Sequence, residues 1–258
     1  MPDFSPAELL QAALEISGSA AAIPMRYFRS EMAVEDKPDA SPVTIADRET
    51  EEHIRRAIAE RFPAHGIYGE EFGESGAGSP YTWVIDPIDG TRSFICGVPL
   101  FGTLIGVLRD GEPVAGVIRM PALDESYAGC RGGAATRNGV AVRCRGVTRP
   151  EEARIFLNEA NRMVEREPER LRRLMTTGHI RRFSNDCYPF ALLASGRIDA
   201  VVDFDLQPYD YLPIVPVVEA AGGVMTDWRG RPLSLHSDGS VVAAATPELH
   251  DAVMDRLG

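Results

Sequence analysis

The stretch WVIDPIDGTRSF, residues 83–94, ends an apolar run in two aspartates, Asp86 and Asp89. Side chains alternate between the two faces of a strand, so carboxylates three residues apart would lie on opposite faces of a continuing strand. Pro87 fixes φ and predicts that the strand ends there. A bend after Asp86 would bring both carboxylates into one cluster, where a divalent cation would relieve their repulsion.

Gly90 and Thr91 follow the second aspartate. Glycine permits a close backbone approach, and a short helix over TRSFIC, residues 91–96, would present its free N–H groups to an anion. Metal-binding carboxylates next to an anion site suit a phosphate ester. The alternative is an ordinary strand followed by Asp-Pro and Asp-Gly turns, because Asp, Gly and Pro dominate turns for local reasons.

Composition limits the class of protein. The chain has 258 residues, which suits one large domain or two intimate ones, and a net charge of -11, which disfavours nucleic-acid binding. No apolar run is long enough to span a membrane, and the N-terminus lacks the pattern of a secretory signal, so we expect a cytoplasmic protein. The four cysteines are scattered and are expected to be free thiols.

A metal site in this chain would use oxygen ligands. The histidines and cysteines form no zinc-like cluster, so the expected ion is a hard cation such as Mg²⁺. Glu70, Asp210 and Asp47 are further candidate acids. Asp210 could instead cap the apolar helix that follows it, and Asp47 could be a first-turn acid that responds to a helix dipole.

The pattern of elements changes near the middle of the chain. The first part combines two long helices with antiparallel strands, and the second alternates strands and helices, which places a boundary between 1–147 and 148–258. Residues 35–44, which include Lys37, and residues 66–80 are expected to be loops. Pro213 is expected in the first turn of a helix over 209–223, and Pro216 is expected to bend it. We expect helices over 5–22, 44–62, 168–175, 184–196, 209–223 and 247–258, and strands over 81–85, 101–120, 127–144, 197–205 and 240–246.

Two long segments resemble the signatures of a known family. WVIDPIDGT and YDYLPIVPVVEAAGG are similar to the two signatures of the inositol monophosphatase superfamily, and GEE and SPVTIAD precede the first in the family's order. The resemblance covers nearly the whole chain. It implies a layered αβαβα fold, with an antiparallel sheet in the N-terminal half and a smaller mixed sheet in the C-terminal half, and a Mg²⁺-dependent phosphomonoesterase that is commonly a homodimer.

The resemblance also implies metal ligands. By motif position, Glu70, Asp86 and the Ile88 carbonyl would hold one Mg²⁺. A second ion would be held by Asp86, Asp89 and Asp210, with Asp86 bridging the two, and a third, weaker ion would lie near Glu70. Two such ions activate a water and stabilise the leaving oxygen.

The remaining implied roles belong to the phosphate and the water. Gly90 and Thr91 would bind the phosphate through their backbone N–H groups. The Thr91 hydroxyl, paired with Asp47, would help to deprotonate the attacking water, so Thr91, Asp47 and Glu70 are the candidate catalytic residues.

Within the superfamily, the chain resembles the histidinol-phosphate phosphatase branch, notably over residues 184–203. Asn185 stands where the branch often has glycine. Asp186 is the candidate partner of the substrate ammonium group, because histidinol phosphate carries an amine whereas inositol phosphate carries only hydroxyls. Alternatively, Asp186 could cap the helix that begins there. Arg92 and Asn185 are further candidate substrate residues, and Arg92 could equally be a surface charge.

Other functions remain as alternatives at this point. The substrate could be inositol 1-phosphate or another small phosphomonoester. A haloacid-dehalogenase-type phosphatase would use D-x-D-G-T, in which the aspartates are two apart and the first is a nucleophile, whereas the spacing here is three. A binding protein without activity could also use the same fold.

Overall fold

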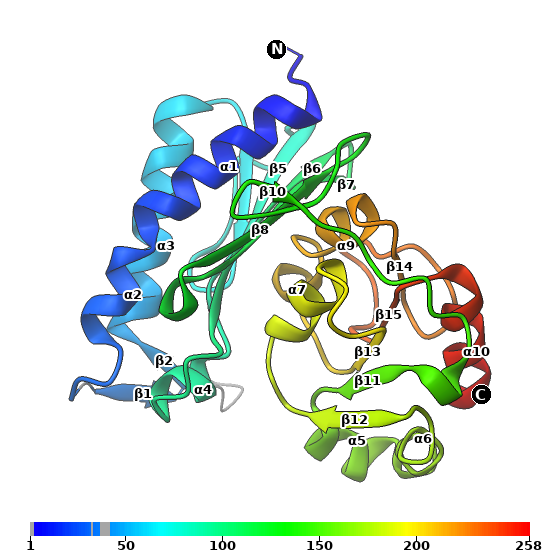
Figure 1. The fold of residues 1–258 in the computed structure, drawn as a ribbon. Coiled ribbons are helices and arrows are strands. Elements are labelled where there is room, and N and C mark those ends of the chain that lie inside the picture. The colour runs from blue at the N-terminus through cyan, green and yellow to red at the C-terminus, as the bar shows by residue number, and fades with distance from the viewer. Residues whose placement is uncertain (1–2, 32, 37–41) are drawn as a thin grey trace.

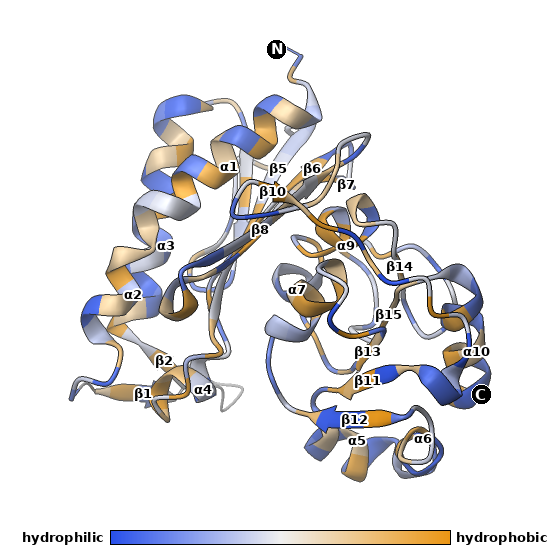
Figure 2. Ribbon diagram, in the orientation of Figure 1, coloured by the Kyte–Doolittle hydropathy of each residue, from blue (hydrophilic) through white to orange (hydrophobic). Residues whose placement is uncertain are grey.

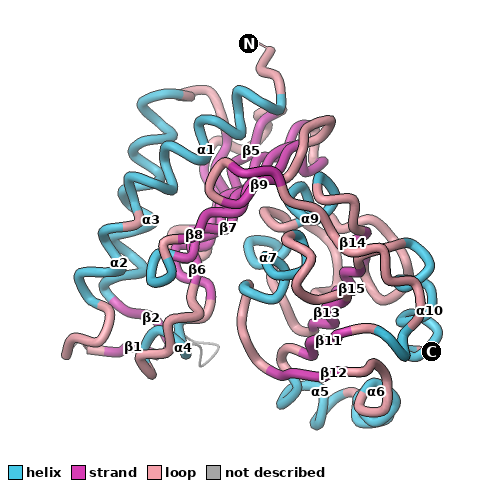
Figure 3. Tube along the Cα trace, viewed as in Figure 1, coloured by secondary structure: helices cyan, strands magenta, loops and turns pink. Residues whose placement is uncertain are grey.

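The computed structural model describes residues 3–31, 33–36 and 42–258. Five layers are stacked, as expected: helices, sheet, helices, sheet, helices (Figure 1). Figure 3 shows the two sheets on either side of an inner layer that contains α7 and α9. The helices are α1 Pro6–Ala20, α2 Ala22–Tyr27, α3 Ile45–Arg61, α4 Thr91–Ile95, α5 Ala160–Arg166, α6 Pro168–Leu174, α7 Tyr188–Ala194, α8 Pro208–Tyr211, α9 Val215–Ala220 and α10 Pro247–Leu257.

The first sheet has eight strands in the order β10-β9-β8-β7-β6-β5-β3-β4. All neighbours are antiparallel except β3 and β5, which run parallel. The sheet is therefore antiparallel as expected apart from one pair, and part of the loop expected over 66–80 forms β3 and β4. The strands are β3 Gly66–Gly69, β4 Gly73–Ser75, β5 Tyr81–Asp89, β6 Gly102–Arg109, β7 Glu112–Met120, β8 Glu125–Cys130, β9 Thr136–Arg137 and β10 Val140–Ala141.

The second sheet is smaller and mixed, as expected, with the order β12-β11-β13-β15-β14. Its first three strands are parallel, and β15 runs antiparallel to both of its neighbours. Its strands are β11 Arg154–Leu157, β12 Ile180–Phe183, β13 Ala200–Asp203, β14 Val224–Thr226 and β15 Val241–Ala244. The division into 1–147 and 148–258 falls between the two sheets and stays a proposal.

A separate two-stranded ribbon joins β1 Val34–Asp36 to β2 Pro42–Thr44. The loop expected over 35–44 is therefore strand at both ends, and Lys37 lies outside the described residues. Figure 2 shows hydrophobic and hydrophilic residues alternating along α1 and α3, which cover the outer face of the first sheet. Ser5 caps α1 through a capping box with Glu8, as the sequence predicts.

The strand at the opening stretch differs from the expectation. Strand β5 does not end at Pro87 but runs to Asp89, with a register shift. Asp86 pairs with Leu104 and Asp89 with Gly102, so three steps along β5 match two steps along β6. This extra residue is a β-bulge, and it gives two aspartates three apart the spacing of residues on one face. The Thr103 hydroxyl donates to the Pro87 carbonyl at 2.9 Å inside the bulge.

The helix expected over 209–223 is two short helices. Helix α8 begins two residues before Asp210, so Pro213 comes too late to be accommodated in the first turn, and it interrupts the helix. Pro216 was expected to bend the helix, but it lies in the first turn of α9, where a missing N–H removes no helical bond. The two helices place Pro213 directly against the first sheet.

Three glycines form a row across the first sheet beneath this break. Gly106 on β6 pairs with Gly116 on β7, which pairs with Gly129 on β8. A Cβ on Gly106 would lie 2.8 Å from the Pro213 Cα, one on Gly116 would overlap the Pro213 carbonyl, and one on Gly129 would lie 2.6 Å from the Pro216 carbonyl. The row therefore lets the backbone around the break approach the sheet closely, which brings Asp210 near β5.

This contact predicts the effect of one methyl group. The substitution Gly116→Ala should destabilise the protein by roughly 1–3 kcal/mol, because the added methyl overpacks a contact between backbones. Gly116 has an ordinary φ, so the cost would be steric rather than conformational. The measurement is the midpoint of thermal unfolding.

Gly18→Ala is the matched control. Gly18 lies in α1 with no atom within 4 Å of the position of its Cβ, so alanine there should leave stability unchanged or raise it. Equal unfolding midpoints for Gly116→Ala and wild type would show that the glycine row is not needed for the close approach.

Candidate active site

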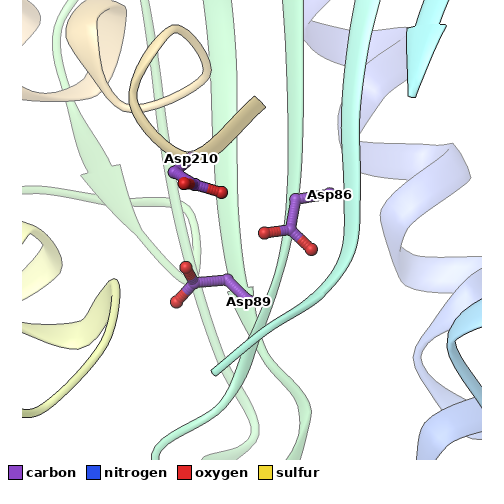
Figure 4. A group of neighbouring side chains, drawn as sticks. All are labelled: Asp86, Asp89 and Asp210. Carbon is purple, nitrogen blue, oxygen red and sulfur yellow. The ribbon is translucent and has the colours of Figure 1, made fainter. Parts of the chain in front are cut away.

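Three carboxylates meet at the C-terminal end of strand β5 in the first sheet. Asp86 and Asp89 come from the bulged end of β5, and Asp210 comes from α8 (Figure 4). One oxygen atom of each lies within 4.8 Å of the other two. The structure thus brings together residues that are more than 120 positions apart in sequence, as the metal-site hypothesis requires.

Asp86 is the most deeply buried of the three, with 2% of its surface exposed. Its Oδ1 atom has no hydrogen-bond partner among the described residues. Burial, followed by the negative charge of Glu70, raises the pKa of Asp86 well above its ordinary value. Glu70 directly follows β3, the parallel neighbour of β5, and its N–H donates to the Ile85 carbonyl at 3.2 Å.

Asp89 and Asp210 each accept one backbone hydrogen bond. The Cys187 N–H donates to Asp89 Oδ2 at 2.6 Å, and the Gln207 N–H donates to Asp210 Oδ2 at 2.7 Å. Burial and the neighbouring Asp186 raise the pKa of Asp89 to about 7, and burial with Asp89 raises the pKa of Asp210 well above its ordinary value. Gln207, not Asp210, is the N-cap of α8, so the N-cap alternative for Asp210 is wrong; Asp210 is instead the third helical residue, and its carboxylate completes a capping box with Gln207.

This donor set fits a hard divalent cation. All three side chains supply carboxylate oxygens, Asp86 Oδ1 is buried without a donor, and the raised pKa values record the cost of keeping the group charged without a counter-ion. Ile88 lines the same cavity, and its carbonyl accepts from the Thr91 hydroxyl at 3.1 Å. The number and identity of the ions stay predictions.

Gly90 and Thr91 start the short helix α4. Gly90 has φ = 81°, the left-handed region, and no side chain of the described residues caps this helix. The Thr91 hydroxyl lies 3.3 Å from Asp47 Oδ1. Asp47 is fully buried, and its other oxygen accepts from the Thr44 N–H and hydroxyl, so it also completes the capping box of α3. Asp47 is therefore a first-turn acid of α3, and its catalytic role stays a prediction for which the contact with Thr91 is suitably placed.

A cavity of about 470 Å³ between the two sheets is lined by Gly90, Thr91 and the acidic cluster, whereas Asp47 lies behind its wall. Asp186 and Arg92 line it as well. The Asp186 carboxylate accepts from the Ser93 hydroxyl at 2.5 Å and lies against Gly90, where a Cβ would be 2.7 Å from Asp186 Cγ. Helix α7 has no side-chain cap, so Asp186 is not its cap. Burial raises the pKa of the Asp186 carboxyl.

Two candidate substrate residues have weaker geometric support. Arg92 is largely exposed, and its guanidinium lies 3.7 Å from the carboxylate of Glu159, which also lines the cavity. Asn185 is partly buried, its side-chain amide donates to the Phe183 carbonyl at 2.9 Å, and it is not among the described residues that line the cavity. The sequence prediction for Asn185 therefore has no support from the cavity.

The cavity also contains residues that the sequence did not single out. Asn158 and Glu159 follow β11, and Asp203 ends β13. Burial raises the pKa of Asp203 well above its ordinary value. A signal was present, because polar residues at the ends of neighbouring parallel strands meet at one sheet edge. Using it required the pairing of β11 with β13, which sequence patterns alone did not establish.

Comparison with known proteins agrees with this geometry. The profile of the inositol monophosphatase family matches residues 5–257. A histidinol-phosphatase from Chlorobaculum parvum is 39% identical over 236 residues, which cover 91% of each chain. The bifunctional phosphatase IMPL2, chloroplastic, from Arabidopsis thaliana is 39% identical over 90% of this chain and 70% of its own length.

A solved structure has the same architecture. The inositol monophosphatase from Zymomonas mobilis superposes with a TM-score of 0.89 at 32% identity, over 99% of both chains.

None of the helices within the described ranges is both long and apolar enough to cross a membrane.

The carboxylate cluster predicts how stability depends on pH without metal. The pKa of Asp89 is about 7 in the folded protein against an ordinary value of 3.8, so its contribution to stability is fully present below about pH 3.8 and is lost progressively as the pH rises to about 7. In EDTA, the unfolding midpoint should therefore fall more steeply between about pH 4 and 7 for wild type than for Asp89→Asn. Mg²⁺ should restore more stability at the upper pH than at the lower.

Asn keeps the size of Asp89 and an oxygen that can accept from Cys187, so the variant isolates the charge. Parallel pH profiles for wild type and variant would contradict the assignment of this titration to Asp89.

Proposed function

We propose, from the premise that this chain belongs to the inositol monophosphatase family, that it is a Mg²⁺-dependent phosphatase whose substrate is L-histidinol phosphate. The observation that carries the proposal is the buried cluster of Asp86, Asp89 and Asp210 beside the start of α4. Acidic ligands and backbone N–H groups meet in one cavity there, which suits a phosphate ester.

The choice of substrate is supported by Asp186. Its carboxylate forms part of the cavity wall, next to Gly90 and therefore near the proposed phosphate position. Histidinol phosphate carries an amine, and a carboxylate at this edge would favour an ammonium group over the hydroxyls of inositol phosphate. The relative from Chlorobaculum parvum, which is named a histidinol-phosphatase, adds support.

In the proposed mechanism, Glu70, Asp86, Asp89, Asp210 and the Ile88 carbonyl would hold two or three Mg²⁺ ions. When bound, these ions lower the pKa of a water and offset charge on the leaving oxygen. Phosphate hydrolysis also needs the phosphate to be oriented and a proton to leave the attacking water.

The chain's own groups would serve both needs. The N–H groups of Gly90 and Thr91 would orient the phosphate. The Thr91 hydroxyl would take a proton from the water as it passes its own proton to Asp47, whose Oδ1 lies 3.3 Å away and whose other oxygen is held by Thr44. For this step the Thr91 proton turns from the Ile88 carbonyl, at 3.1 Å, to Asp47. Burial raises the pKa of Asp47, so its carboxylate is a better base than an exposed aspartate.

Inositol 1-phosphate is the second candidate substrate. The structural similarity to the Zymomonas mobilis inositol monophosphatase supports this substrate. The overall scaffold and the acidic cluster would accept either phosphate ester. The homodimer and the cytoplasmic location also remain predictions, and sedimentation of the purified protein would test the first of them.

The substrate proposal predicts an order of activities. With Mg²⁺, kcat/KM for L-histidinol phosphate should exceed that for inositol 1-phosphate by at least about 10-fold, because a hydrogen-bonded ion pair with Asp186 is available only to the ammonium group. Phosphate release measures both. Asp186→Asn should remove most of this preference while leaving inositol 1-phosphate within about threefold of wild type. Equal or reversed values for the wild-type enzyme would overturn the substrate assignment but not the phosphatase class.

The metal proposal predicts loss of turnover in a folded variant. Asp89→Asn should reduce kcat by at least about 100-fold, because one cluster ligand becomes neutral. Circular dichroism should show an unchanged fold. EDTA should abolish wild-type activity and Mg²⁺ should restore it, whereas near-normal turnover by Asp89→Asn or by metal-free enzyme would refute this role.

A further inference from the structure

Asn158 connects two segments of the second half at the cavity. It directly follows β11 and is buried, with 3% of its surface exposed. Its amide nitrogen donates to the Asp186 carbonyl and to Asp203 Oδ2, both at 2.9 Å, and its Oδ1 accepts from the Asn185 N–H at 3.4 Å. Both amide protons are therefore used, and a buried amide with satisfied partners holds its neighbours rigidly.

The segment that Asn158 holds has an unusual backbone. Ser184 and Asp186 have φ values of 48° and 50°, in the left-handed region that residues other than glycine seldom adopt. Such conformations persist when surrounding contacts over-determine them. Two contacts to the first half supplement Asn158, from Cys187 N–H to Asp89 and from the Ser93 hydroxyl to the Asp186 carboxylate.

The position of Asp186 has little tolerance. Its carboxylate lies so close to Gly90 that a single added methyl would collide with it. A relaxation of the Asp186 backbone toward an ordinary φ would move the carboxylate along the cavity wall. Productive contacts require placement to within about 0.5 Å, so the residue that fixes the backbone also controls what the carboxylate can bind.

We propose that Asn158 is a positioning residue for substrate choice, which acts by holding Asp186 in its left-handed conformation. The proposal rests on the proposed function, in which Asp186 receives the substrate ammonium. Asn158 has no proton left for the substrate, because both are donated to protein acceptors. Its effect on specificity therefore passes through Asp186.

The test compares two substrates. In Asn158→Ala, kcat/KM for L-histidinol phosphate should fall by about 10-fold or more, chiefly through KM, because a buried acceptor loses its donor and Asp186 relaxes. The amine-free ester p-nitrophenyl phosphate should change by less than about threefold, since it makes no contact with the carboxylate. An equal loss for both substrates, or an unchanged ratio in a folded variant, would overturn the proposal.

Asn138→Ala is the matched control. Asn138 has a left-handed backbone of its own, with φ = 49°, and its side-chain amide joins the turn between β9 and β10 to the start of β8: its oxygen accepts from the Ser126 N–H and its nitrogen donates to the Asp124 carbonyl. It is not among the described residues that line the cavity. This variant should lose some stability without a change in the substrate ratio.

A double-mutant cycle separates positioning from general damage. If Asn158 acts through Asp186, adding Asn158→Ala to Asp186→Asn should not change the substrate ratio further. If the two residues act independently, the two fold-changes in the substrate ratio should multiply in the double variant, and that result would overturn the proposal. If Asn158→Ala does not fold, Asn158→Leu, which is close to asparagine in size and removes the donor without adding a charge, takes its place and carries the same expectations.

The same measurements distinguish failure of the proposed function. If the wild-type enzyme prefers inositol 1-phosphate, the histidinol phosphate assignment fails. The cycle is then run with inositol 1-phosphate against p-nitrophenyl phosphate, and coupling between the two positions still decides whether Asn158 positions Asp186.

Discussion

The constraint on which this structure depends is the repulsion among carboxylates held within 4.8 Å of one another. Burial removes the water that would screen Asp86, Asp89 and Asp210, so their pKa values rise and each negative charge opposes the next. Flexible side chains on loops would move apart to relieve this repulsion. Here the cluster is kept because a central strand and a packed helix supply its members, and a cation converts the repulsion into binding.

Two backbone features hold the cluster together. The bulge in β5 adds one residue between Asp86 and Asp89 and thereby gives them a common direction. The glycine row across β6, β7 and β8 removes the side chains that would otherwise keep the backbone at Pro213 away from the sheet. The bulge places Asp86 and Asp89, the two candidate ligands on one strand. The glycine row brings Asp210, the third candidate ligand, close to them.

These features explain what the sequence could and could not predict. The motifs identified the acidic cluster, the layered fold and the helices α1, α3 and α10, because those signals are local or were carried by long signatures. Pro87 was misread as a strand end, since a bulge within a paired strand tolerates proline and depends on the register with β6. The glycine row and the role of Asn158 were invisible for a similar reason: each is defined by residues that only strand pairing brings together.

Asp89 connects the two parts of the chemistry. Its carboxylate belongs to the acidic cluster, yet its Oδ2 accepts from Cys187 N–H, the residue next to Asp186. A displacement of Asp89 would therefore disturb both the proposed cation ligands and the cavity edge at Asp186 where the substrate ammonium is proposed to bind. Asn158 holds that edge from the opposite side, through the Asp186 carbonyl. A segment anchored at both ends can exchange side chains and so alter substrate choice, whereas its backbone must keep the geometry that the cluster imposes.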